Sequence, residues 1–224
     1  MIIGVISDAH GNIFGLKKMV NALEQLNAEK IFFLGDAINY FARSREVLAF
    51  LRQKNINCIK GNHEFLLLSG DEGRSEQKLV YNINLTREVL MSEDYSYIDS
   101  WDNCVEIKIG NTTLLMTHSG IVDDPERYFY PDSNLDDFAK LPQDIFFIGH
   151  THIPFIRKIG SKLIVNVGSV GLPRNDGRYI TCALFDSETG DVDIIKNRFP
   201  MEKLQELQPF APQILDILRR RDDG

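Results

Sequence analysis

Five short apolar runs in this chain are each followed by polar side chains of the kinds that bind metal ions. The run that opens the chain ends just before Asp8 and His10, which places a carboxylate and an imidazole two residues apart. The four later occurrences are Gly35-Asp36 after 31–34, Gly61-Asn62-His63-Glu64 after 56–59, His118 after 114–116, and Gly149-His150-Thr151-His152 after 145–148. Oxygen and nitrogen donors mixed in this way are typical of sites for divalent transition metals.

These polar residues are expected to meet at one place in the fold. Short apolar runs rich in Ile and Phe, bounded by Gly and polar residues, are typical of buried strands. In open α/β sheets, ligands bind at the carboxyl ends of the strands. The chain has five histidines, and all of them lie in these segments. The alternative, that they are caps and turn residues, would fit Asp8 and His10 alone but explains the complete set poorly.

The first half of the chain has the pattern of a βαβ unit. Asn12 is placed to cap a helix with Leu16, Met19, Val20 and Leu23 at helical spacing, and Ser44 is placed to cap a second. Alternation of strands and helices predicts a largely parallel sheet. Further helices are expected to begin at 64–68 and to cover 76–91, where they would cover the sheet.

The second half has the pattern of successive hairpins. Residues 105–109 and 113–117 flank Gly110-Asn111, 155–159 and 163–167 flank Gly160-Ser161, and 179–185 and 192–196 flank a turn at 188–190. A short helix is expected at 212–221. A βαβ half followed by an antiparallel half predicts two facing sheets with helices outside them.

Length and composition favour one ordinary globular domain that covers residues 1–224. Hydrophobic residues make up 43% and charged residues 25% of the chain. The net charge of −7 argues against general nucleic-acid binding. It leaves room for a nucleotide-like substrate, because two bound divalent metals would add about four positive charges locally.

The cysteines and the apolar runs favour a protein of the cytoplasm. Cys58, Cys104 and Cys182 are odd in number and widely separated, so we expect reduced thiols rather than a disulfide framework. The apolar start is too short for a signal peptide, and no apolar run is long enough for a membrane span. We therefore expect no membrane association.

The five segments together resemble the sequence blocks of the calcineurin-like metallophosphoesterases. Asn166-Val-Gly-Ser169 is similar to the Asn-Pro-Gly-Ser segment of the small single-domain bacterial and archaeal phosphodiesterases in that superfamily, with Val167 in place of proline. The resemblance extends from residue 1 to about 185. It implies an α/β (α+β) fold, a four-layer α/β/β/α sandwich of two mixed sheets flanked by helices.

The resemblance also implies which residues would hold two metal ions. The first ion would be bound by Asp8, His10, Asp36 and His152, and the second by Asp36, Asn62, His118 and His150. These mixed ligands suit Mn, Fe, Co, Ni or Zn better than Ca or Mg, with manganese as the first choice. Two such ions activate a bridging water as hydroxide and neutralise charge on the phosphate.

Other residues are expected to act on the substrate or to support the ligands. In the family, the histidine that corresponds to His63 faces the substrate, so His63 is the predicted catalytic residue, with a structural histidine as the alternative. Glu64 is expected to orient a ligand or to begin a helix. Arg174 is a candidate phosphate contact or a surface arginine. Gly168 and Ser169 would contact substrate or hold an imidazole ring in orientation.

We expect hydrolysis of a small or nucleotide-like phosphodiester. Hydrolysis of a phosphomonoester, a phosphoprotein or a dinucleoside polyphosphate is the alternative enzyme function, and a scaffold like the retromer subunit of this fold is the non-enzyme alternative. The presence of all five histidines argues against the scaffold, whose metal site is degraded. The aromatic loop at 121–134, with Tyr128, Phe129 and Tyr130, could stack a base, but the sequence favours packing on a neighbouring subunit of a homo-oligomer.

Overall fold

The first of two sheets contains the strands that begin the chain. The computed structural model describes residues 1–70, 79–120 and 127–222. In this sheet the strand order is β10-β9-β1-β2-β3, in which β1 to β3 are parallel and β9 and β10 are antiparallel to their neighbours. The strands are β1 (Ile2–Ile6), β2 (Lys30–Phe33), β3 (Asn57–Cys58), β9 (Tyr179–Asp186) and β10 (Val192–Arg198).

The second sheet is also mixed, with the strand order β4-β5-β6-β8-β7. Its three central strands β5, β6 and β8 are parallel, and the outer strands β4 and β7 are antiparallel to them. The strands are β4 (Cys104–Ile109), β5 (Thr112–Thr117), β6 (Ile145–Ile148), β7 (Phe155–Ile159) and β8 (Lys162–Asn166).

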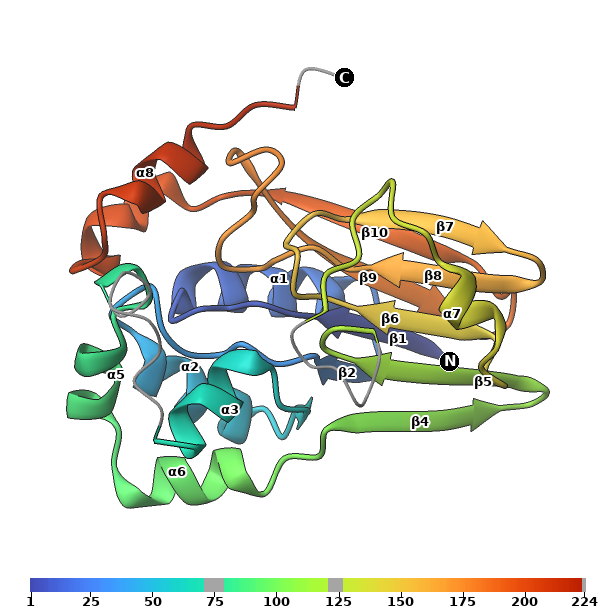
Figure 1. Cartoon of the computed structure of the whole chain (residues 1–224), viewed down its shortest axis with the longest axis horizontal. Helices are drawn as coiled ribbons and strands as arrows, with labels where there is room; N and C mark the ends of the chain where they lie inside the picture. Colours follow the sequence, from blue (N-terminus) through green and yellow to red (C-terminus); the bar gives the residue numbers. More distant parts are fainter. Residues whose placement is uncertain (71–78, 121–126, 223–224) are drawn as a thin grey trace.

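Helices cover the outer faces of both sheets (Figure 1). Most lie with the first sheet, where α1 packs on β9 and α2, whereas α7 contacts β7 and β8 of the second sheet. The helices are α1 (Ile13–Gln25), α2 (Ser44–Gln53), α3 (Asn62–Leu68), α5 (Ile83–Val89), α6 (Ser92–Asp99), α7 (Asp136–Ala139), α8 (Gln213–Leu218) and the 3₁₀ helix η1 (Met201–Leu207).

The alternation of side chains along the strands creates the layers. On β5, Leu114 and Met116 point into the core between the two sheets, while Leu115 packs in the outer core with α7. On β1, Val5 belongs to the core between the sheets and Ile6 to the core beneath the helices. Each such side chain contributes about 1.5–3 kcal/mol when fully buried. This confirms the predicted four-layer α/β/β/α sandwich.

Three details of the fold differ from the sequence expectations. The hairpin of β9 and β10 joins the first sheet, beside β1, and the centre of the second sheet is parallel. The three predicted hairpins form, but the prediction that they make up a separate antiparallel half was wrong. The second helix has Arg43 as its N-cap, because the hydroxyl of Ser44 accepts a hydrogen bond from the backbone N–H of Asn39 instead.

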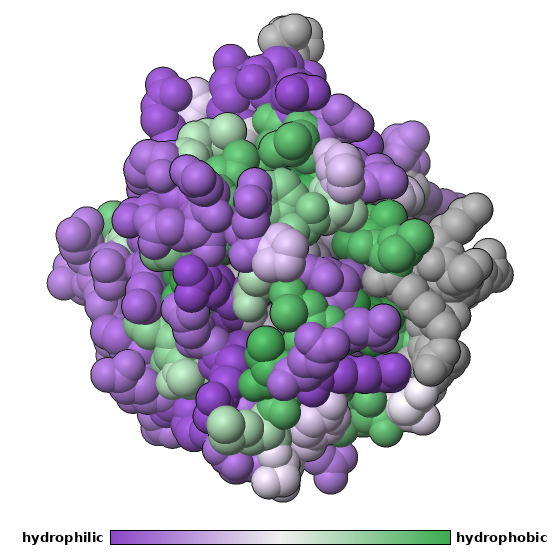
Figure 2. Space-filling model, turned by 90° about the vertical axis from the view of Figure 1, so that its left-hand side faces the viewer, coloured by the Kyte–Doolittle hydropathy of each residue, from purple (hydrophilic) through white to green (hydrophobic). Residues whose placement is uncertain are grey.

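The helix predicted over 76–91 is interrupted. Residues 76–78 lie outside the described residues, 79–81 are helical, and Asn82 has a left-handed backbone (φ 59°) before α5 begins. Its predicted apolar face is only partly buried, since Leu79 is 79% and Met91 47% exposed. Figure 2 shows the face of the molecule at the helical end, where hydrophilic residues are interspersed with small hydrophobic areas.

Candidate metal centre

The predicted ligands come together at the carboxyl ends of strands from both sheets. Asp8 and His10 follow β1, Asp36 follows β2, His118 follows β5, and His150 and His152 follow β6. Asn62 and His63 begin α3. The backbone N–H of His150 donates to the carboxylate of Asp8 at 3.1 Å, which connects the two sheets at this edge. Residues from the first and the second sheet thus form one centre.

One cluster contains Asp8, His10, Asp36 and His152, all buried. The Nε2 atoms of His10 and His152 are 3.0 Å apart. His152 Nε2 is 3.1 Å from Asp8 Oδ1, and His10 Nε2 is 3.6 Å from Asp36 Oδ2. These four residues are the ones that the sequence assigns to a first metal ion.

A second cluster contains Asp36, His118 and His150. His118 Nε2 lies 3.3 Å from Asp36 Oδ2 and 3.1 Å from His150 Nδ1. The amide oxygen of Asn62 is 3.0 Å from the same His118 nitrogen, so Asn62 completes the predicted set. Oδ2 of Asp36 faces both clusters, while its Oδ1 accepts a 2.9 Å hydrogen bond from the backbone N–H of His63.

The donor atoms fit divalent metal ions. His10, His118 and His152 each have Nδ1 within 2.6–3.1 Å of a backbone carbonyl, of Ile38, Leu34 and Leu172 respectively. Because a carbonyl only accepts hydrogen bonds, Nδ1 carries a proton in each of these rings, and in a neutral ring the lone pair of Nε2 points into the cluster. Lone pairs 3.0 Å apart repel one another unless a cation lies between them. Two ligands about 2.0–2.1 Å from one ion are separated by about 3.0–3.4 Å.

An unpaired oxygen supports the same conclusion. Asp8 Oδ1 is a buried atom without a hydrogen-bond partner among the described residues. A buried carboxylate oxygen in this condition carries a large desolvation penalty, which a bound cation removes. The residues present therefore fit the two metal ions.

The imidazoles of the two clusters differ in protonation state. Burial lowers the pKa of His150 to about 3 and, together with the nearby Arg174, that of His152 to about 4, which leaves both imidazoles neutral. Burial opposes charge on His118 too, but the Asp36 carboxylate outweighs it and raises the pKa of His118 to about 10. Although burial alone would raise the pKa of Asp36, His118, His63 and His10 hold it well below its usual range.

The backbone is strained at the ligands. Asp8, His10, Asp36, His150 and His152 all have φ between 47° and 68°. Residues other than glycine rarely adopt this left-handed region, and each instance costs about 1–3 kcal/mol. Strain concentrated at five predicted ligands marks this edge as the functional part of the fold.

Two residues near the ligands stabilise this backbone. The Glu64 carboxylate accepts hydrogen bonds from the backbone N–H groups of Asp36, Ala37 and Gly61 at 2.7–2.9 Å. The Ser169 hydroxyl donates to the carbonyl of Asp8 at 2.8 Å and accepts from the N–H of Leu172 at 2.7 Å. Glu64 therefore lies in the first turn of α3 and positions Asp36, as expected.

Gly168 and Ser169 have a positioning role in this structure. Both are buried, and neither lines the pocket above the clusters. The backbone of Gly168 has φ 76°, and a Cβ there would meet the Thr181 hydroxyl at 1.9 Å. Ser169, through Asp8, holds the strand end that carries the ligands. These contacts are to backbone groups, so contact with substrate and orientation of an imidazole ring both stay predictions for this segment.

A narrow pocket lies above the clusters. Its cavity is about 10 Å³, the room of a single water molecule. The wall consists of Asp36, Tyr40, Asn62, His63, Tyr81, Tyr128, His150, His152 and Arg174. His63 Nδ1 is 2.8 Å from the Asn39 amide nitrogen and its Nε2 is 3.9 Å from Asp36 Oδ2, so the ring is fixed beside the ligands.

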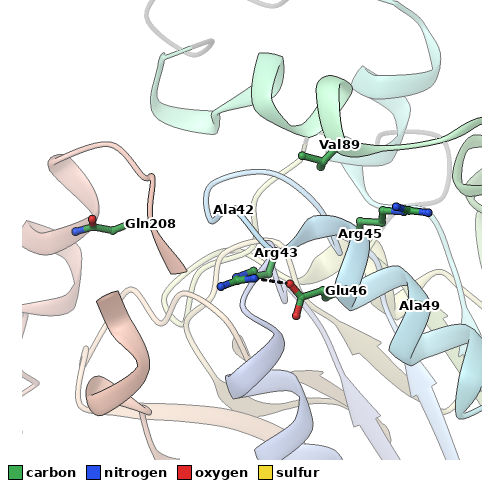
Figure 3. A pocket seen from close by; sticks show the side chains of 7 residues that line it. All are labelled: Ala42, Arg43, Arg45, Glu46, Ala49, Val89 and Gln208. Carbon is green, nitrogen blue, oxygen red and sulfur yellow. Dashed lines mark hydrogen bonds and ion pairs between the residues drawn. The ribbon is translucent and has the colours of Figure 1, made fainter. Parts of the chain in front are cut away.

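Arg174 lies on the same wall. Its guanidinium donates to the hydroxyl of Tyr40 at 3.1 Å. The side chain therefore faces the pocket. The alternative prediction, a surface arginine that projects into solvent, was wrong. A larger cleft of about 860 Å³, between the start of α2 and α5, contains none of the predicted ligands (Figure 3). Arg43 in that cleft is paired with Glu46 at 2.7 Å.

A two-sheet sandwich with Asp and His clusters at its strand ends is the architecture of a metallophosphoesterase. Residues 1–190 match the model of the calcineurin-like phosphoesterase superfamily domain, and the chain belongs to this family. This confirms the resemblance seen in the sequence. The family uses divalent metals, in agreement with the two clusters. Within the described residues, no helix is long and apolar enough to cross a membrane.

Relatives cover nearly the whole chain. An uncharacterized protein of Methanocaldococcus jannaschii is 29% identical over an alignment of 223 positions, which covers 92% of this chain and 90% of that protein. The crystal structure of a metallophosphoesterase from Sphaerobacter thermophilus is similar with a TM-score of 0.78 at 22% identity, covering 97% and 98% of the two chains. A hypothetical protein from Pyrococcus horikoshii has a TM-score of 0.79 at 20% identity, with 97% of both chains covered. Both structures share the fold.

Proposed function

We propose that this protein is a binuclear metal-dependent phosphodiesterase. The observation that carries the proposal is that Asp36 Oδ2 faces both clusters, 3.6 Å from His10 Nε2 and 3.3 Å from His118 Nε2. One carboxylate shared between two sets of imidazoles is the arrangement that holds two ions as a pair. Asp8 and His152 would complete the first ion's ligands, and Asn62 and His150 the second's.

The ions would supply a water of lowered pKa and Lewis-acid stabilisation of the phosphoryl oxygens. The donor set contains four imidazole nitrogens beside carboxylate and amide oxygens, which suits Mn, Fe, Co, Ni or Zn, and we take manganese as the first choice. Asn62 is neutral, so it ligates without adding negative charge.

His63 is the proposed catalytic residue that is not a ligand. Its ring is held by Asn39 at one nitrogen, and the other nitrogen faces the pocket beside Asp36. A neutral imidazole there can donate a hydrogen bond to a phosphoryl oxygen, and in its protonated form it can give a proton to the leaving oxygen. Arg174, on the wall beside His152, would bind a non-bridging phosphate oxygen.

The charge of the pocket wall favours a diester over a monoester. Among the described residues that line the pocket, Arg174 is the only side chain with a permanent positive charge, and three are tyrosines. A monoester dianion would call for more cations than this, whereas a diester carries one negative charge and two organic substituents that tyrosines can contact.

The alternatives make different demands on the molecule. A monoesterase or a dinucleoside polyphosphate hydrolase would need further cations around the phosphates. A scaffold would have no use for strained, buried ligands, and all seven predicted ligand side chains are present and converge.

The test is hydrolysis of bis-(p-nitrophenyl) phosphate and of p-nitrophenyl phosphate by metal-stripped protein resupplied with Mn²⁺. We expect activity that returns with the metal and is greater on the diester. The Arg174→Gln variant should raise KM, and the exposed Arg219→Gln is the matched control. A preference for the monoester would replace the proposal with a phosphatase. Absence of both metal binding and activity would favour the scaffold.

A further inference from the structure

Two tyrosines stand parallel and half-exposed beside the candidate metal centre. The ring planes of Tyr128 and Tyr130 differ by 9°, and their centroids are 6.0 Å apart. Tyr128 is 44% and Tyr130 42% exposed. Aromatic side chains of this size are normally more deeply buried, so two parallel, half-exposed rings at one place call for a reason.

The backbone that carries the two rings is well anchored. Phe129, between them, points inward and is only 2% exposed, with its ring 4.9 Å from that of Phe138. The backbone N–H of Tyr130 donates to the Ser133 hydroxyl at 2.8 Å. Because the middle residue is buried, its two neighbours point outward together, and the ring pair is organised before any ligand binds.

Tyr128 connects this ring pair to the metal centre. Its centroid is 4.0 Å from that of His150, a predicted ligand, and it lines the pocket together with Arg174. The pocket itself has room for about 10 Å³. A phosphate bound at the ligands must therefore leave its organic substituents outside the pocket. Tyr128 lies at the pocket wall and Tyr130 lies beside Tyr128, so both rings are near these substituents.

We propose that Tyr128 and Tyr130 form a stacking platform for a nucleobase, so that the substrate is a small nucleotide-type phosphodiester. This inference rests on the proposed phosphodiesterase function. Flat aromatic faces recognise bases by stacking, which strengthens binding by about 5- to 150-fold per base. The net charge of −7 is unfavourable for a long nucleic acid, which is why the proposed substrate is small.

The test also distinguishes two other roles that the tyrosines could have. Tyr128 could serve only to cover the His150 ring, and Tyr130 could pack against a second copy of the chain, as the sequence favoured. Neither role predicts that binding depends on a base. The contrast between a nucleotide and the same sugar phosphate without its base therefore separates them from the platform.

The experiment is calorimetric binding of adenosine 5′-monophosphate and of ribose 5-phosphate to the Mn²⁺-loaded protein. We expect the nucleotide to bind at least about fivefold more tightly. Tyr130→Ala should bring the ratio of the two affinities close to one, whereas Tyr130→Phe, which keeps the ring, should retain it. Tyr130 is the better position than Tyr128, because Tyr128 also contacts a predicted ligand.

Equal or absent binding of the two compounds by the wild-type protein would overturn the platform, and so would a ratio that survives in Tyr130→Ala. If Tyr130→Ala instead converts a dimer into a monomer without changing the ratio, the tyrosines belong to an interface between copies. Failure of the proposed function is read separately. If the protein prefers the nucleotide but does not hydrolyse bis-(p-nitrophenyl) phosphate, the stacking platform is supported and the phosphodiesterase function is contradicted.

Discussion

The carboxylate of Glu64 accepts a 2.7 Å hydrogen bond from the backbone N–H of Asp36. Asp36 has a left-handed backbone (φ 59°) and faces both clusters with one oxygen. Glu64 is itself buried and also accepts from Ala37 and Gly61. A residue that ligates nothing thus holds the shared ligand in its strained conformation.

Replacement of Glu64 by Gln should weaken metal binding without unfolding the protein. The amide keeps the size of the side chain but turns an NH₂ group toward one of the backbone donors, which leaves that donor unsatisfied. Loss of such a supporting contact reduces metal affinity by about 10- to 100-fold, and the unsatisfied donor destabilises by about 1–3 kcal/mol. Metal titration and thermal unfolding measure the two effects. Unchanged affinity would show that Asp36 keeps its position without Glu64.

Replacement of Asp36 by Asn should affect both ions at once. The variant loses the negative charge that the two clusters share, so metal content and diester hydrolysis should fall together. Elemental analysis after dialysis measures the first, and Asp132→Asn, an exposed carboxylate, is the control. A variant that loses one ion and retains the other tightly would show that the clusters are independent.

Replacement of His63 by Ala should separate catalysis from metal binding. His63 contacts Asn39 and faces the pocket, and its proposed role is to assist the reaction. The variant should retain its metal while kcat falls by about 10²- to 10⁴-fold. Loss of metal from this variant would make His63 a ligand or a structural residue.

Metal binding should release a proton from His118. Its pKa in the metal-free protein is raised to about 10, against an ordinary value of 6.5, so the imidazole is protonated throughout this interval. Its contribution to the stability of the metal-free fold is complete below pH 6.5 and is lost as pH rises toward 10. An ion that binds Nε2 must displace this proton, so metal affinity should rise with pH over the same interval.

Calorimetry of Mn²⁺ binding at pH 7.5, in buffers with different ionisation enthalpies, measures the released protons. The wild-type protein should release about one proton more than His118→Asn, which offers an oxygen ligand in place of the imidazole. His150 has a pKa lowered to about 3 and should contribute none. Equal proton release by the two proteins would contradict the role of His118.

The sequence was sufficient to predict that the ligands converge, because each follows a strand and all five histidines follow strands. It could not predict how the pocket wall is completed. Tyr81 lies in a segment whose apolar spacing indicated only a helix on the sheet, yet its ring is 4.5 Å from that of His63. Asn39 follows the shared ligand Asp36 by three residues, and only the structure places its amide on His63.

Strand pairing was beyond the sequence for a similar reason. The turn at 188–190 predicts the hairpin of β9 and β10, but nothing local indicates that Val5 pairs with Ala183 of that hairpin. Long-range pairing depends on which apolar faces remain uncovered after the other strands have packed. The position of Ser169 follows from it, since β9 begins shortly after this residue and the Thr181 N–H donates to its carbonyl.

The central claim is that Asp36 links two metal ions, and the most direct test is Mn²⁺ titration followed by electron paramagnetic resonance. We expect two ions per chain, with a spectrum that shows magnetic exchange between them, because ions in such sites are about 3.5–4 Å apart. One ion per chain, or two ions that give only the spectrum of isolated Mn²⁺, would contradict a shared centre.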